Sequence, residues 1–145
     1  MTGDKELLNY MIENINMGLE ALESLTKNLE NTDNKIKSNV LKSLDVYKNF
    51  YQKCDIMRKQ VKCEPAKKGL IATMMTKMGT NMEFRRDNSD SKIAETLIQG
   101  YNMGILDITK KMKMYKNDTS RDVMELAEEY KKMMEQGIED IKGFL

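Results

Sequence analysis

The sequence predicts an all-α protein: a bundle of four helices in a single domain that spans residues 1–145. The chain of 145 residues contains 1 proline and 8 glycines, so little in it interrupts a helix. Hydrophobic residues make up 40% and charged residues 32%, which suits a soluble domain with a core. Along four stretches, apolar residues recur at seven-residue spacing, as in helices that face partner helices.

The first two predicted helices span about 4–30 and 35–62, and Asp4 is a suitable N-cap for the first. A polar connector at 31–34 separates them, and Pro65 disfavours helix in the residue before it. These helices therefore predict one hairpin. Their main heptad rows are Leu8, Ile15, Leu22 and Leu29, then Met11, Gly18 and Leu25, then Val40, Tyr47, Cys54 and Val61.

The third and fourth predicted helices span about 91–116 and 121–145. A polar run at 87–91 precedes the third helix, with Asp90 or Ser91 as the expected cap, and the turn lies at 116–120. These helices predict a second hairpin. Their main rows are Ala94, Tyr101, Ile108 and Tyr115, then Val123, Tyr130, Gly137 and Phe144.

The two hairpins resemble each other in sequence. Residues 16–19, Asn-Met-Gly-Leu, recur at 102–105 as Asn-Met-Gly-Ile, and this shift of 86 residues carries the heptad register of the first helix onto the third. The second helix maps onto the fourth, with Tyr47 on Tyr130. The sequence therefore predicts an internal repeat with pseudo-two-fold symmetry. Similarity between unrelated amphipathic helices is the alternative explanation.

Antiparallel pairing within each hairpin predicts which residues face each other. Gly18 would face Tyr47, and Gly104 would face Tyr130, in one central layer between the hairpins. The steric interpretation is that glycine makes room for the ring and the phenol finds a polar partner. The alternative is a small, polar-lined ligand pocket. Its candidate residues are Gly18, Tyr47, Tyr101, Gly104 and Tyr130.

A long crossover at 62–92 joins the hairpins, and a short amphipathic helix is predicted at about 66–80. From Lys62 to Arg86 the crossover has six basic and two acidic residues. Such a segment can bind an anionic membrane or an acidic partner, or cross over within the same molecule with its apolar face inward. The candidate surface residues are Lys67, Lys68, Met74, Met75, Lys77, Met78, Arg85 and Arg86.

Several classes of function conflict with the composition. There is no histidine, which excludes Ser-His-Asp and Cys-His catalysis, histidine-bound zinc and haem held by histidine. A net charge of +1 argues against nucleic-acid binding by bulk charge, and the sequence has no apolar stretch of ~20 residues that would span a membrane. Cys54 and Cys63 are interpreted as reduced thiols of a cytoplasmic protein. We therefore predict no catalytic residue, no cofactor and no metal ligand.

Two similar hairpins joined by a long crossover resemble the ferritin-like four-helix-bundle superfamily. More loosely, the chain resembles small bacterial bundle proteins of unknown function, including spore-coat-associated ones. The resemblance implies a metal site made from inward carboxylates and two Glu-x-x-His pairs. Without histidine those pairs cannot exist, and the register places most carboxylates outside the core, with Asp107 and Glu129 on its flank. This chain would then be a member that lacks the metal site.

These observations predict a non-enzymatic cytoplasmic helical-bundle protein that acts through homo-oligomerisation or binding of a protein partner. The first alternative is a degenerate ferritin-like protein that binds a ligand or metal in the central layer. The second alternative is peripheral binding to anionic membranes through the basic, methionine-rich crossover.

Overall fold

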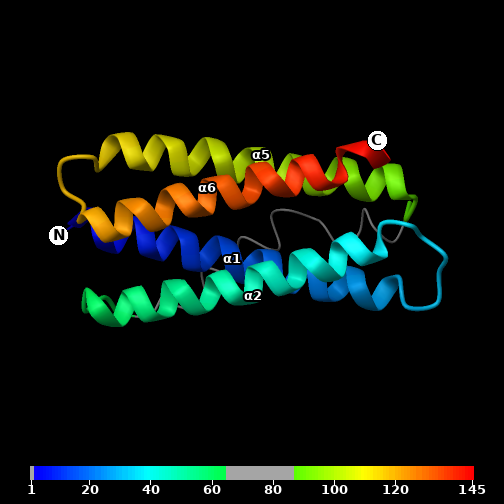
Figure 1. Cartoon of the computed structure of the whole chain (residues 1–145), viewed down its shortest axis with the longest axis horizontal. Coiled ribbons are helices and arrows are strands. Elements are labelled where there is room, and N and C mark those ends of the chain that lie inside the picture. The colour runs from blue at the N-terminus through cyan, green and yellow to red at the C-terminus, as the bar shows by residue number, and fades with distance from the viewer. Residues whose placement is uncertain (1, 65–86) are drawn as a thin grey trace.

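The computed structural model describes residues 2–64 and 87–145, and all regular structure in these ranges is helical. The prediction of an all-α protein with four helices is confirmed (Figure 1). The short helix predicted at about 66–80 lies outside the described residues. The elements are α1 (Thr2–Asn28), α2 (Lys37–Gln60), α5 (Asp90–Met114), α6 (Arg121–Ile141) and a short 3-10 helix, η1 (Lys142–Phe144).

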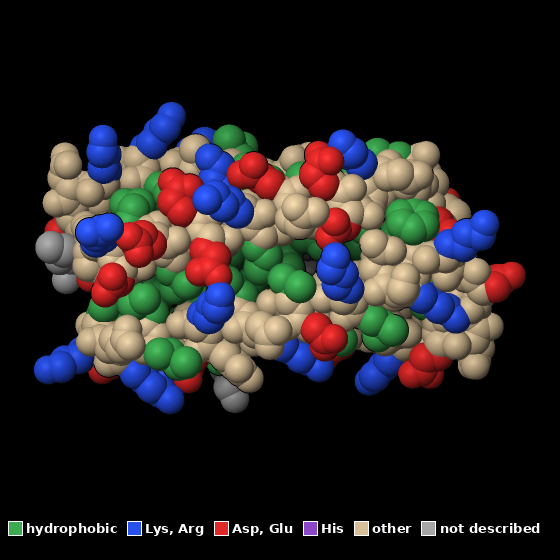
Figure 2. Space-filling view, viewed as in Figure 1, with side chains coloured by type: hydrophobic (Ala, Val, Ile, Leu, Met, Phe, Trp, Pro, Cys, Tyr) green, Lys and Arg blue, Asp and Glu red, His purple; other side chains and the backbone are tan. Residues whose placement is uncertain are grey.

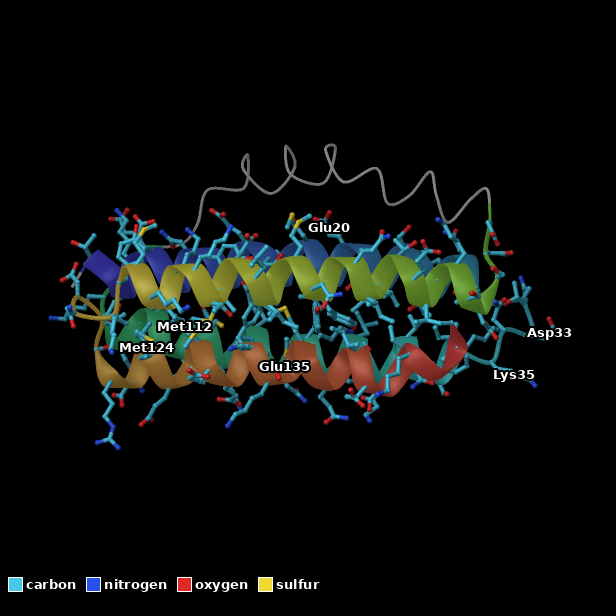
Figure 3. All side chains as sticks on the ribbon, turned by 90° about the horizontal axis from the view of Figure 1, so that it is seen from above. Glu20, Asp33, Lys35, Met112, Met124 and Glu135 are labelled. Atoms are coloured by element: carbon cyan, nitrogen blue, oxygen red, sulfur yellow. The ribbon has the colours of Figure 1, made fainter. Side chains whose placement is uncertain are left out.

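The helices pack as two antiparallel pairs. α1 packs mainly against α2, and α5 packs mainly against α6, while α1 also contacts both α5 and α6. The two views agree that α5 lies beside α1 and α6 beside α2 (Figures 1 and 3). Along the bundle, α1 and α6 run in one direction and α2 and α5 in the other. The connector that contains Asp33 and Lys35 is therefore at the opposite end from Met112 and Met124 (Figure 3).

The heptad rows identify most of the core, but Val61, Tyr115 and Phe144 at the ends of the rows are only partly buried. Every member of the row that begins at Leu8 and ends at Leu29 is at most 2% exposed. Because complete burial of a leucine or isoleucine side chain contributes about 1.5–3 kcal/mol, these rows supply much of the stability of the bundle. The fully buried set includes Leu7, Leu8, Met11, Ile15, Leu25, Ile93, Ile108, Tyr130 and Met134.

The sequence predicts that Asp4 caps its own helix. In the structure it instead caps the start of α6. Because α1 already begins at Thr2, Asp4 lies in its first turn and is 5% exposed. Its carboxylate accepts a hydrogen bond of 2.7 Å from the backbone N–H of Ser120. This contact satisfies a donor that the N-terminus of a helix would otherwise leave unpaired, and it joins the two hairpins.

Asp90 makes the reciprocal contact at the other end of the bundle. Ser89 is the N-cap of α5, and its hydroxyl accepts a hydrogen bond from Lys92 N. Asp90 lies in the first turn, and its carboxylate accepts hydrogen bonds from Asn34 Nδ2 at 2.9 Å and from Lys35 N at 3.1 Å. In each hairpin, an aspartate of the first helix therefore accepts a hydrogen bond from the backbone just before the second helix of the other hairpin.

The second helix of each hairpin ends earlier than the sequence predicts. α2 ends at Gln60 because Lys62 adopts a left-handed conformation with φ 59°, and Cys63 N donates to Arg58 O at 2.9 Å. A left-handed residue that closes a helix in this way is a common C-terminal motif. α6 ends at Ile141, where the chain tightens into η1.

Candidate functional site

Gly18 lies against the ring of Tyr47, as antiparallel pairing of the first hairpin predicts. A Cβ atom added to Gly18 would be 2.7 Å from Cδ2 of Tyr47, which is closer than packed atoms approach. The missing side chain therefore allows the buried ring to pack directly on the backbone of α1.

The predicted pairing of Gly104 with Tyr130 is wrong. A Cβ atom at Gly104 would be 2.5 Å from Sδ of Met134, and one at Gly137 would be 2.9 Å from Cζ of Tyr101. The pairing of α5 with α6 is therefore displaced by one helical turn from the predicted one. Tyr130 and Met134 are four residues apart and both buried, so the heptad pattern fits either register.

The five candidate pocket residues consequently form two groups in the core, Gly18 with Tyr47 and Tyr101, and Gly104 with Tyr130 on either side of Asn14. Tyr47 and Tyr101 are neighbours, with ring centroids 6.4 Å apart and an interplanar angle of 61°. The Tyr101 hydroxyl donates to Ser43 Oγ at 3.4 Å. Burial raises the pKa of both phenols, so they remain neutral hydrogen-bonding groups.

Tyr130 belongs to a second polar cluster. Asn14 Nδ2 donates to its hydroxyl, and its ring packs against Phe50 and Tyr10 with centroid distances of 5.6 Å and 6.4 Å. The Tyr10 hydroxyl donates to Asp107 Oδ2 at 3.2 Å. Burial raises the pKa of Tyr10 and Tyr130, and the negative charge of Asp107 raises both further.

The sequence interpretation did not include Tyr10 and Asn14 in this cluster, because neither belongs to the heptad rows of the first helix. Tyr10 lies on the flank, where it reaches Asp107 across the interface between α1 and α5. The amide of Asn14 lies close to Gly104 and Tyr130 at once. The feature of the sequence that could have identified them is their polarity. Both side chains can form hydrogen bonds with the phenols and carboxylates of the neighbouring helices.

The acidic side chains on the core flank make protein contacts. Asp107 accepts from Tyr10, and Glu129 forms an ion pair with Lys53. Among residues 2–64 and 87–145, no group of three or more Cys, Asp or Glu side chains could hold a metal ion. Cys54 is buried, and burial together with the charge of Glu129 raises its thiol pKa to about 12. The thiol is therefore protonated at neutral pH.

A groove opens between α2 and α6 beside the Tyr47–Tyr101 pair. Because Gly137 has no side chain, the groove reaches the ring of Tyr101, and Lys42 and Asp140, which form an ion pair at 3.4 Å, are also among its lining residues. On this face a hollowed strip of hydrophobic side chains runs between charged ones (Figure 2). The groove has a volume of about 140 Å³ and is lined by Lys42, Ser43, Val46, Tyr47, Tyr101, Met133, Gln136, Gly137 and Asp140.

The volume of this groove indicates what it can hold. Pockets for small molecules and cofactors are usually about 300–1,000 Å³, whereas a cavity of about 150 Å³ holds one benzene ring. At about 140 Å³, the groove fits one side chain or one small ring. Of the predicted pocket residues, Tyr47 and Tyr101 line it, whereas Gly18, Gly104 and Tyr130 are not among its lining residues.

The basic, methionine-rich surface predicted on the crossover lies outside the described residues. It consists of Lys67, Lys68, Met74, Met75, Lys77, Met78, Arg85 and Arg86. In the part of the chain that the structure describes, no helix has the length and apolar character needed to cross a membrane.

Comparison of this chain with family models, with curated proteins and with solved structures gives no match. Its function therefore has to be argued from the groove and from the arrangement of the helices.

Proposed function

We propose that this protein is a non-enzymatic helical bundle that acts by binding a protein partner, and that the groove between α2 and α6 is the contact site. The observation that carries the proposal is the combination of an apolar floor, a volume of about 140 Å³ and rims of opposite charge. The free thiols Cys54 and Cys63 support a reducing compartment, the cytoplasm.

The size of the groove favours a protein partner over a cofactor. A hydrophobic anchor from a partner helix would enter beside Val46 and Met133 and cover the ring of Tyr101. Val46 is 38% exposed, and Lys42 and Asp140 at the rim remain available for polar contacts. A groove lined in this way by two helices is the usual receptor for an amphipathic helix.

We further propose a ferritin-like layout with an internal repeat. In ferritin-like bundles one long crossover joins two hairpins, and here α2 and α5 run in the same direction. The position of the second hairpin that corresponds to Asp4 is Asp90, and both carboxylates hold the entry to a helix of the other hairpin. Gly18 and Gly104 also correspond, and each receives a side chain from its partner helix.

Site-specific photo-crosslinking tests the proposed contact. A photo-reactive amino acid at position 46, in the full chain within the cells that produce it, should give a defined protein adduct. The matched control is position 106 on α5, where Leu106 is exposed outside the groove. Equal crosslinking at both positions, or none at position 46, would overturn the proposal.

A further inference from the structure

We infer that the partner at the α2–α6 groove is a second copy of this chain, which gives a two-fold symmetric dimer. The inference rests on the proposed function, because it names the protein that enters the groove. It is argued from the charges of α2 and α6, their direction, the exposed apolar side chains between them and the area of this face.

The two helices that border the groove have opposite charge. α2 carries six basic and two acidic residues, whereas α6 carries three basic and seven acidic ones. On the face itself, the basic partners Lys42 and Lys53 come from α2 and the acidic partners Asp140 and Glu129 from α6. Figure 2 shows Lys and Arg side chains together with Asp and Glu side chains along the hydrophobic strip on this face.

Two ion pairs fix how α2 and α6 lie relative to each other. Lys42 pairs with Asp140 at 3.4 Å, and Lys53 pairs with Glu129. The two ion pairs therefore lie at two levels along the bundle. These levels are eleven residues apart on each helix, which corresponds to about 16 Å. All four side chains remain more than a quarter exposed, so each can also interact with charges of another molecule.

Such a face is complementary to itself about one axis. Rotation by 180° about an axis parallel to the helices places the α2 helix of one copy on the α6 helix of the other. Positive then meets negative at both levels, in an isologous contact. Rotation about an axis that crosses the helices would instead place α2 on α2 and α6 on α6, which brings like charges together. The charge pattern therefore selects the first arrangement.

The same rotation brings apolar groups together. Val46 lies between the two ion-pair levels, across the groove from Met133 and Gln136. A rotation about an axis parallel to the helices preserves the level, so Val46 of the second copy faces the groove of the first. Ile56, which is 58% exposed, is on the same side of α2 as Lys42 and Lys53 by helical spacing and extends the apolar contact.

The face is comparable in area to a standard protein–protein interface. A helix of 24 residues such as α2 is about 36 Å long, and two adjacent helices are about 20 Å wide. The face therefore offers on the order of 700 Å² per copy, near the roughly 800 Å² per partner of a standard interface.

Complementary charge reversal tests the inference on the full chain. The wild-type protein should sediment with twice its mass of 16.8 kDa. One variant, K42E with K53E, makes both helices acidic at the face, and a second variant, E129K with D140K, makes both basic. Each variant alone should dimerise at least about tenfold more weakly, and an equimolar mixture should recover a heterodimer. Circular dichroism establishes that each variant is folded.

The matched control is K110E with K113E, which makes the same change of charge at two exposed positions of α5. This variant should dimerise like the wild type. A monomeric wild-type protein at 100 µM, or reversal variants that dimerise normally, would overturn the inference. If the purified chain is monomeric while position 46 still crosslinks to a different protein in cells, the second copy is excluded and the proposed groove function stands. If position 46 gives no adduct, both fail.

Discussion

At the residue scale, three glycines determine how closely the helices approach. Gly18, Gly104 and Gly137 each lie where a neighbouring ring or thioether packs on the helix backbone. A glycine within a helix costs about 1 kcal/mol relative to alanine, and the close packing of a large buried side chain offsets that cost. The position of Gly18 opposite Tyr47 could be predicted from antiparallel pairing. The position of Gly137 opposite Tyr101 could not, because it depends on the register of α6.

Replacement of Gly18 by alanine should destabilise the protein by about 1–3 kcal/mol, since the new methyl group would overlap the buried ring of Tyr47. Urea unfolding measures the change. The control is Gly100→Ala in α5, where a Cβ atom meets nothing within 4 Å. That variant should be more stable than the wild type by up to about 1 kcal/mol, because alanine favours helix. Similar effects of both substitutions would contradict the packing described here.

The two thiols should react at different rates. Burial holds the pKa of Cys54 at about 12, whereas Cys63 is partly exposed. At pH 8, a thiol reagent should therefore label Cys63 quickly and Cys54 only as the protein opens. Mass spectrometry of the labelled protein measures the two rates. The variant Cys63→Ser isolates the slow reaction, and fast labelling of that variant in its native state would show that Cys54 is accessible.

At the element scale, the heptad pattern predicts where the four helices lie but not how their ends are satisfied. From the sequence, Asp4 and, with Ser91 as its alternative, Asp90 are predicted to cap their own helices. In the structure their carboxylates accept from backbone N–H groups of Ser120 and Lys35 in the other hairpin. A local sequence rule cannot identify this partner, because it comes close only after the hairpins pack.

Substitution of Asp4 by alanine should therefore lower the free energy of unfolding by about 1–2 kcal/mol and weaken the docking of one hairpin on the other. Asp90→Ala should act in the same way at the opposite end. The exposed connector residue Asp33 provides the control, since Asp33→Ala should change stability by less than about 0.5 kcal/mol. Native-state hydrogen exchange should show the start of α6 opening in the first variant and the start of α2 in the second. Protection unchanged at these helix starts would argue against reciprocal capping.

At the scale of the whole molecule, polar groups connect the four helices through the core. Tyr47 and Tyr101 join α2 to α5, and the hydrogen bonds of Tyr10 and Tyr130 join α1, α5 and α6. Burial raises the pKa of all four phenols. The folded state therefore requires them to be neutral.

This requirement predicts that the bundle is lost in alkali. Because the folded pKa of each phenol exceeds its unfolded value of ~10, its contribution is complete below pH ~10 and disappears as the pH rises above that value. In this range, ionisation of each such phenol in the unfolded state lowers the free energy of unfolding by about 1.4 kcal/mol for every unit by which the pH rises. Urea unfolding at pH 8, 10 and 11 measures the slope. Tyr47→Phe should reduce the slope of the free energy of unfolding against pH by the contribution of one phenol. An unchanged slope would contradict a neutral, buried Tyr47.

The sequence by itself determined the helical class, the four helices and their buried rows, because the heptad period fixes which side of each helix is apolar. It also determined the absence of histidine chemistry. The tertiary structure decided the pairing of α6 with α5, the partners of Asp4 and Asp90, and the groove at Gly137. The physical reason is that a shift of one helical turn still places apolar residues on the same side of the helix, so the heptad pattern is compatible with both registers. Only packing of real side chains, with Met134 against Gly104 and Tyr101 against Gly137, distinguishes the two registers.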